Sequence, residues 1–195
     1  MEYDFILASS SPRRLALLSQ AGISPKRVES PDVTEEREKG ETPLAYVRRM
    51  ARTKASAVAS RYAGENVLAA DTIVVMGDRI FAKTDDAEKA KQTLLMLSGR
   101  RHRVITAVCL VDKNGKERIR HSVSHVRFKR LSHNELAEYL ASGEWRGKAG
   151  SYAVQGRAEC FVREIIGSYS NIVGLPLCDT VNLLNGIKPV AEERS

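Results

Sequence analysis

The chain has 195 residues, of which 43% are hydrophobic and 28% are charged, a composition that allows one globular domain with a sizeable core. It excludes a disordered protein, and no apolar run approaches the ~20 residues that a transmembrane helix needs. The formal net charge of +7 favours an anionic partner without identifying it.

The N-terminus and the cysteines indicate the compartment. Residues 1–4 are Met-Glu-Tyr-Asp, and this acidic start lacks the basic and apolar stretches of a signal peptide. We therefore expect a cytoplasmic protein without a membrane partner. Cys109, Cys160 and Cys178 are an odd number and show no C-x-x-C spacing, which favours three buried free thiols over a disulfide framework or a zinc site.

Hydrophobic periodicity and turn residues divide the chain into alternating strands and helices. In chain order we expect a strand at 3–8, a helix at 12–21, a strand at 26–30, a helix at 43–61, a strand at 67–75, a short return strand at 80–81, a helix at 86–98 capped by Asp85, strands at 101–112 and 117–130, and helices at 133–142 and 176–185. Residues 186–195 form a polar tail. This order predicts one α/β domain over residues 1–195, built on a mixed sheet.

Residues 9–14, Ser-Ser-Ser-Pro-Arg-Arg, join the first strand to the first helix. Ser11 can cap that helix, and Pro12 suits its first position because proline has no N–H to lose. The free N–H groups of the helix start, the hydroxyls and the guanidinium groups of Arg13 and Arg14 favour phosphate binding. A capped helix with two solvated arginines explains the same residues, so the segment alone does not establish a site.

Asp71 is the acid that most strongly indicates chemistry. Four apolar residues precede it and three more follow Thr72, so its carboxylate lies within a strand expected to be buried on both faces. Burying a charge is costly unless the charge is paired or binds a metal, which favours function over a simple turn cap. Lys54 on a helix face and Lys83 at a helix start fit a phosphate site and a solvated surface equally well.

Two further segments have both a functional and a structural explanation. Residues 147–156 hold three glycines, which let the backbone approach a ligand, and Gln155 can donate and accept toward a base edge. A purely structural loop explains the same residues. The basic clusters 100–103 and 127–130 fit a nucleic-acid surface or solvated strands, and the low aromatic content of 6% argues against base stacking.

Taken together, these motifs resemble the Maf family of nucleoside triphosphate pyrophosphatases. The resemblance covers residues 3–185, and it depends on several motifs that occur in the family's order. The motifs are residues 7–14 (Leu-Ala-Ser-Ser-Ser-Pro-Arg-Arg), 70–74 (Ala-Asp-Thr-Ile-Val), 97–99 (Leu-Ser-Gly), 148–156 (Lys-Ala-Gly-Ser-Tyr-Ala-Val-Gln-Gly) and 167–177 (Gly-Ser-Tyr-Ser-Asn-Ile-Val-Gly-Leu-Pro-Leu).

The resemblance implies hydrolysis of a nucleoside triphosphate to the monophosphate and pyrophosphate with a divalent metal, Mg²⁺ or Mn²⁺. It also implies an elongated mixed α/β fold with a central cleft, similar to inosine triphosphatase, and a homodimer. The catalytic acid falls on Asp71, and either Asp71 or Glu35 would hold the metal. The residues that contact phosphate or line the cleft fall on Ser9, Arg13, Arg14, Glu35, Lys54 and Lys83.

Substrate choice also follows from the resemblance. Arg13, Thr72 and Gln155 match the branch that acts on dTTP and UTP rather than the branch that acts on methylated guanine nucleotides. Related or modified pyrimidine nucleotides stay open. The chain departs from the family at Thr34, where an acid often precedes Glu35, and after Lys83, where many members continue with Pro-Arg. These departures argue against a metal ligand at position 34 and a phosphate contact at position 85.

Two questions stay open from the sequence. Asp71 could deprotonate the attacking water or bind the metal that activates it. The competing hypothesis is a nucleotide- or RNA-binding module without turnover that uses the basic strands. It explains the net charge but not an acid inside an apolar strand, so we do not expect a nucleic-acid partner.

Overall fold

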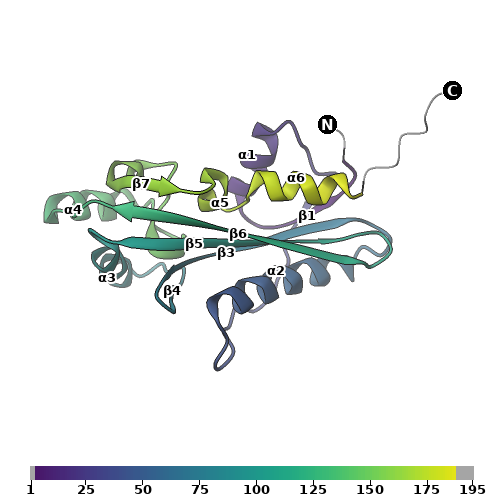
Figure 1. Ribbon diagram of the computed structural model, residues 1–195, viewed down its shortest axis with the longest axis horizontal. Coiled ribbons are helices and arrows are strands. Elements are labelled where there is room, and N and C mark those ends of the chain that lie inside the picture. The colour runs from purple at the N-terminus through teal and green to yellow at the C-terminus, as the bar shows by residue number, and fades with distance from the viewer. Residues whose placement is uncertain (1–2, 188–195) are drawn as a thin grey trace.

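Seven strands form one mixed sheet that follows the long axis of the molecule (Figure 1). The computed structural model describes residues 3–187. The strands are β1 (Ile6–Ala8), β2 (Arg27–Glu29), β3 (Val67–Met76), β4 (Arg79–Phe81), β5 (Arg101–Val111), β6 (Glu117–Phe128) and β7 (Val162–Ile166). Their order is β2-β1-β3-β5-β6-β7, with β4 pairing to the far end of β3. Among the described strands, the β1–β2 and β1–β3 pairs are parallel and the others are antiparallel.

Helices cover both faces of the sheet and create two hydrophobic clusters. They are α1 (Pro12–Gln20), α2 (Pro43–Ala59), α3 (Ala87–Leu97), α4 (His133–Ser142), α5 (Tyr169–Val173) and α6 (Leu177–Asn185), with 3-10 turns at Ala149–Ser151 and Arg157–Phe161. The smaller cluster joins α2 to one face through side chains such as Val47 and Ile105. The larger cluster joins the opposite face to the other helices. In Figure 1, α2 lies below the long strands, whereas α1, α5 and α6 lie above them.

The edge of β3 has a gap that positions the site. Residues 67–69 pair with β1 on this edge, and residues 74–76 pair with β4. Within the described chain, residues 70–73 pair only with β5, on the other edge. The gap therefore leaves one side of the strand open around Asp71 and Thr72.

Several local predictions are confirmed and others are wrong. Pro12 does open α1, but the Ser11 side chain makes no cap hydrogen bond, and the Ser11 backbone N–H donates to Ser9 Oγ at 3.1 Å. Asp86, not Asp85, caps α3 by accepting from two backbone N–H groups. The Ser132 capping box forms as expected at the start of α4.

The expected fold class agrees with the structure. The mixed α/β sheet and its elongated shape are confirmed (Figure 1). Within the described part of the chain, no helix is long and apolar enough to cross a membrane. Cys109 is buried as predicted, whereas Cys160 and Cys178 are exposed, so the expectation of three buried thiols is wrong. Of the predicted polar tail 186–195, residues 188–195 lie outside the described residues.

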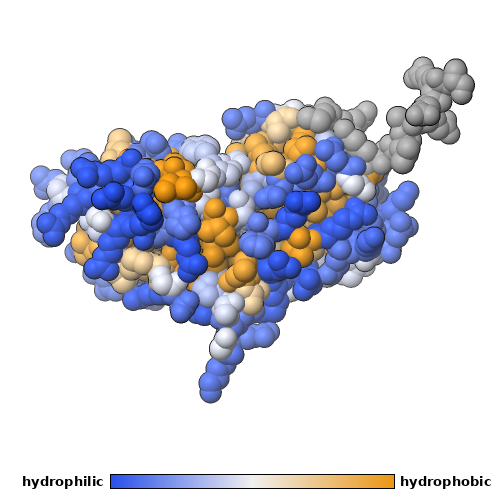
Figure 2. Space-filling view, in the orientation of Figure 1, coloured by the Kyte–Doolittle hydropathy of each residue, from blue (hydrophilic) through white to orange (hydrophobic). Residues whose placement is uncertain are grey.

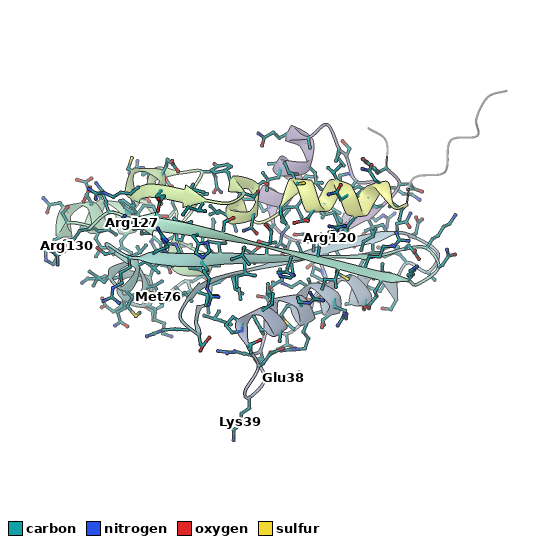
Figure 3. The ribbon with its side chains drawn as sticks, in the orientation of Figure 1. Glu38, Lys39, Met76, Arg120, Arg127 and Arg130 are labelled. Carbon is teal, nitrogen blue, oxygen red and sulfur yellow. The ribbon has the colours of Figure 1, made fainter. Side chains whose placement is uncertain are left out.

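The basic clusters lie at one end of the sheet. Figure 3 places Arg127 and Arg130 at that end, and Figure 2 shows that its surface is strongly hydrophilic. Arg101 pairs with Glu164 at 3.0 Å, on a neighbouring strand. Phe128, the aromatic residue of the second cluster, is buried and therefore offers no stacking surface.

Candidate active site

A cavity of about 350 Å³ opens beside the gap in β3. The connection from β1 to α1, the loop at 30–42, α2, β3, the loop at 147–156 and α5 all contribute to its wall. Six basic side chains and one acidic side chain line it, which makes it suitable for a polyanion. The predicted site residues among its lining are Ser9, Arg13, Arg14, Glu35, Lys54, Thr72, Lys83 and Gln155.

Asp71 lines a neighbouring cavity of about 550 Å³. The two cavities share Glu35, Thr72 and Lys83 in their walls, so Asp71 lies directly beside the first cavity. Adjacent strand residues point to opposite faces, which explains why Asp71 contacts α2 while Thr72 contacts α1 and the Gly174 carbonyl after α5. Neither Thr34 nor Asp85 lines either cavity.

An alternating chain of charges forms one wall of the site. The Lys54 ammonium group donates to Asp71 Oδ1 and to Glu35 Oε1, each at 2.5 Å. Lys83 Nζ reaches the other oxygen of Glu35 at 3.0 Å. The side chains of Lys54 and Asp71 are only 4% exposed, whereas those of Glu35 and Lys83 face the cavity. The four charges balance, which allows an ammonium group and a carboxylate to be buried together.

Glu35 is held ionised and in place. Burial alone would raise the pKa of its carboxyl group, but the hydrogen bonds and charges of Lys54 and Lys83 lower that pKa to about 2. The Tyr46 hydroxyl donates to the Glu35 carbonyl at 3.2 Å, and Arg49 holds Glu41 at the end of the same loop. Figure 3 shows Glu38 and Lys39 at the projecting tip of this loop, so its base, not its tip, belongs to the site.

Arg13 and Arg14, both at the start of α1, differ in their hydrogen bonding. Arg14 donates to Ser9 Oγ at 3.1 Å, to the Gly174 carbonyl at 2.9 Å and to Thr72 Oγ1 at 3.4 Å, all neutral acceptors. Burial lowers the pKa of Arg14, although the negative charge of Asp71 opposes this shift. Arg13 has a buried Nε without a partner, and burial lowers its pKa as well. Both guanidinium groups are positively charged, and no carboxylate of the described residues accepts a hydrogen bond from either of them.

A buried polar network connects Thr72 to α5. Thr72 Oγ1 lies 2.9 Å from Thr106 Oγ1, and Thr106 donates to the backbone carbonyl of Asn171 at 3.0 Å. The Asn171 amide donates to the Val104 carbonyl and to Ser124 Oγ. This network fixes α5, and with it Gly174, against the sheet. We did not predict it, because a single polar residue in a short helix shows no sequence signal beyond its place in the 167–177 motif.

The loop at 147–156 is fixed by close packing. Gly150 has a φ of +68°, and a Cβ added there would lie 2.8 Å from Val74 Cγ2, so a larger residue does not fit without rearrangement. Tyr152 lies on the cavity wall, and its hydroxyl is 2.9 Å from His102 Nε2. Gln155 is exposed at the cavity, as a residue that reads a ligand requires.

Arg146 and Lys148 also line the cavity, although we had not assigned either to the site. Arg146 donates to the Asp85 carbonyl at 3.3 Å and lies 4.7 Å from the ring centre of Trp145. Lys148 donates to the Arg146 carbonyl at 3.0 Å. Their basic side chains could have indicated a phosphate-binding role, but we interpreted this loop from its glycines and Gln155.

Basic side chains around a cavity, with Glu35 in its wall and Asp71 directly beside it, define a protein suited to bind a polyanion next to a carboxylate. A family model described as Maf-like protein matches residues 4–187, and the chain belongs to this family. The resemblance inferred from the motifs is thereby confirmed.

Two relatives that are identical to this chain at more than half of the aligned residues agree with the family. A protein of Zymomonas mobilis subsp. mobilis named dTTP/UTP pyrophosphatase is 52% identical and covers 94% of this chain and 91% of its own length. A protein of Rhodospirillum rubrum with the same name is 55% identical, and the alignment covers 93% of this chain and 86% of that protein. Among solved structures, a nucleoside-triphosphatase (dITP/XTP pyrophosphatase) of Mycobacterium abscessus shares 25% identity over 66% of this chain and 75% of its own, with a TM-score of 0.44.

Proposed function

We propose that this protein hydrolyses dTTP and UTP to the nucleoside monophosphate and pyrophosphate. The observation that carries the proposal is the buried Asp71–Lys54–Glu35 chain at the wall of a strongly basic cavity. Relatives that are 52% and 55% identical to this chain over the aligned residues are named dTTP/UTP pyrophosphatase. Related or modified pyrimidine nucleotides are further candidate substrates.

The cations of the cavity bind the phosphates. A triphosphate carries about four negative charges, and its hydrolysis develops more charge on the leaving oxygen, so cations around the chain stabilise the transition state. Arg13 and Arg14 can each donate two parallel hydrogen bonds to a phosphate, and Ser9 lies beside Arg14. The Lys83 ammonium group pairs with Glu35, and it remains partly exposed at the cavity.

The residues present fit a divalent metal bound together with the nucleotide. Both Glu35 and Asp71 contact the same ammonium group at 2.5 Å, so their oxygens are no more than twice that distance apart. In the described part of the chain, no group of three or more His, Cys, Asp or Glu side chains could hold a metal ion by itself. Mg²⁺ suits such a site because it commonly takes one or two carboxylates and completes its shell with phosphate oxygens and water. When bound, the metal would neutralise charge on the phosphates.

Asp71 orients the attacking water. The water oxygen forms a bond to the α-phosphorus, the bridging P–O bond breaks with its electron pair going to the pyrophosphate, and Asp71 or solvent receives the proton. The carboxylate already accepts a hydrogen bond from Lys54, which fixes its orientation. Whether Asp71 takes the proton or holds the metal is decided by the experiment below.

The test compares Asp71→Asn with the unaltered protein on dTTP, UTP, CTP and a methylated guanosine triphosphate, with pyrophosphate release as the readout. We expect Asp71→Asn to abolish release while nucleotide binding and melting temperature change little, since asparagine keeps the shape of aspartate and Lys54 keeps its ion pair with Glu35. Full activity of this variant would exclude the assigned role. If Asp71 only holds the metal, excess Mn²⁺ should restore part of the rate.

Thr72 and Gln155 select the base. Gln155 is free to pair with the carbonyl and N–H edge of a pyrimidine, and an unmatched buried polar group costs about 1–3 kcal/mol. We expect Gln155→Glu to weaken the preference for uracil and thymine on the order of tenfold, measured as the ratio of kcat/KM values across the same nucleotides. An unchanged substrate profile would remove Gln155 from base recognition.

The alternative of a binding module without turnover has less support. It does not explain the buried acid, and the basic end of the sheet lacks an exposed aromatic side chain in its second cluster. A pure binder would release no pyrophosphate from any nucleotide of the panel. The cytoplasmic location and the homodimer expected from the sequence stay predictions.

A further inference from the structure

The cations around the cavity fall into two groups with different charge balance. Lys54 and Lys83 are compensated by Glu35 and Asp71 within one chain of ion pairs. Arg13, Arg14, Arg146 and Lys148 form no ion pair with any residue that the structure describes. The cavity therefore has one electrically balanced wall and one wall with excess positive charge.

Arg13 and Lys148 form no ion pair among the described residues in spite of partial burial. The Nε of Arg13 is buried and donates to no acceptor there, and Lys148 donates to the Arg146 carbonyl at 3.0 Å. Arg13 and Lys148 line the same cavity, so their like charges repel each other there. Burial lowers the pKa of Lys148 and the positive charge of Arg13 lowers it further, whereas the negative charge of Glu144 opposes this shift. An anion between them would relieve this repulsion and satisfy Arg13.

Their positions are fixed by elements far apart in the sequence. Arg13 lies in the first turn of α1, and Lys148 directly precedes the 3-10 turn at Ala149–Ser151. The contact of Gly150 with Val74 sets how closely this turn approaches the sheet. A pair held in this way is preorganised for one ligand group.

The distribution of charge in the substrate matches the two walls. Of the roughly four negative charges of a nucleoside triphosphate, the β- and γ-phosphates carry about three and the α-phosphate about one. The balanced wall, which holds Asp71, suits the α-phosphate, where the water attacks. The wall with excess positive charge suits the more highly charged pyrophosphate group.

We infer that Arg13 and Lys148 form the subsite for the pyrophosphate group, with Lys148 as a further substrate-binding residue. This inference rests on the proposed function, because the same site must hydrolyse a nucleoside triphosphate. Lys148 contacts the leaving group both before the P–O bond breaks and afterwards, when it is free pyrophosphate.

The experiment measures product inhibition in Lys148→Met, Lys148→Arg and the unaltered enzyme. A charge-assisted hydrogen bond is worth enough that Lys148→Met should raise the inhibition constant of pyrophosphate about 10- to 100-fold. Inhibition by dTMP, which lacks the pyrophosphate group, should stay unchanged. Lys148→Arg should keep most of the pyrophosphate affinity because it keeps the charge.

Arg146→Met is the matched control. Arg146 comes from the same loop and lines the same cavity, but its guanidinium group is engaged by the Asp85 carbonyl and the Trp145 ring. We expect a much smaller effect on pyrophosphate than from Lys148→Met. Melting temperatures of the variants show whether each is folded, and calorimetric titration of pyrophosphate into each protein gives an affinity without turnover.

Several results would overturn the inference. Unchanged inhibition by pyrophosphate in Lys148→Met would exclude the subsite, and an equal loss for pyrophosphate and dTMP would show a general disturbance of the cavity. An equal loss in Lys148→Arg and Lys148→Met would show that shape rather than charge matters. Failure of the unaltered enzyme to release pyrophosphate from any nucleotide would instead contradict the proposed function, which separates the two failures.

Discussion

The buried ammonium group of Lys54 balances two carboxylates, and its removal tests how the protein tolerates charge at the site. In Lys54→Met, Asp71 would lose its ion-pair partner while its side chain stays 4% exposed. Glu35 would retain Lys83 at 3.0 Å and is 38% exposed, so it contributes little to the loss. The destabilisation therefore comes mainly from one unpaired buried carboxylate.

Removing one partner of a buried pair costs about 3–5 kcal/mol, and the nearby positive charge of Arg14 favours the lower end of that range. For a chain of this size, a loss of about 3 kcal/mol lowers the melting temperature by roughly 6–12 °C. The assay is urea unfolding followed by circular dichroism, performed on Lys54→Met, Asp71→Asn and the double variant. The double variant should recover most of the loss, since a neutral asparagine side chain at position 71 no longer needs a counter-charge.

A Lys54→Met protein within about 1 kcal/mol of the unaltered protein would refute this reasoning, because that small change is typical of an exposed ion pair. Failure of the double variant to recover stability would also contradict it. That second result would assign the loss to packing of the lysine stem rather than to charge.

Two further predictions concern pH and packing. The folded-state pKa of Glu35, about 2, lies below its ordinary value of 4.5, so its ionised form stabilises the fold above pH 4.5, and this stabilisation is lost as the pH falls toward 2. Glu35→Gln should flatten the acid side of the curve of unfolding free energy against pH, and an unchanged slope would contradict the assignment. Gly150→Ala should cost about 1–3 kcal/mol, because its Cβ would lie 2.8 Å from Val74 and its φ is +68°. Thermal unfolding checks this, and Val74→Ala in the same chain should recover part of the loss.

The sequence predicted most elements of the fold and not the way in which their edges pair. Uninterrupted apolar residues identified β3 as a strand buried on both faces, and the capping box at Ser132 located α4. The gap between β1 and β4 could not be predicted, because strand pairing depends on contacts between distant segments. Helix α5, with only five residues, is too short for its periodicity to be read.

The candidate site was predicted in a similarly uneven way. Asp71 was identifiable from chemistry alone, since a carboxylate inside an apolar strand needs a partner. That this partner is Lys54 could not be inferred, because only the packing of α2 on β3 brings the two together. Glu35 lies in a polar loop without periodicity, so the family resemblance alone indicated it. Lys148 and Asn171 were missed because their roles depend on which cavity or core their segments reach.

The opening at the edge of β3 has a consequence for how this enzyme can change. Asp71 and Thr72 are neighbours on opposite faces of one strand, so an insertion or deletion of a single residue upstream would exchange the directions in which they point. Substitution at position 72 leaves the Asp71 carboxylate in place, whereas a one-residue shift along the strand changes the orientation of both side chains. Under the proposed function, a substitution at position 72 would therefore change selection of the base alone, whereas a change in the length of this strand would also reorient Asp71.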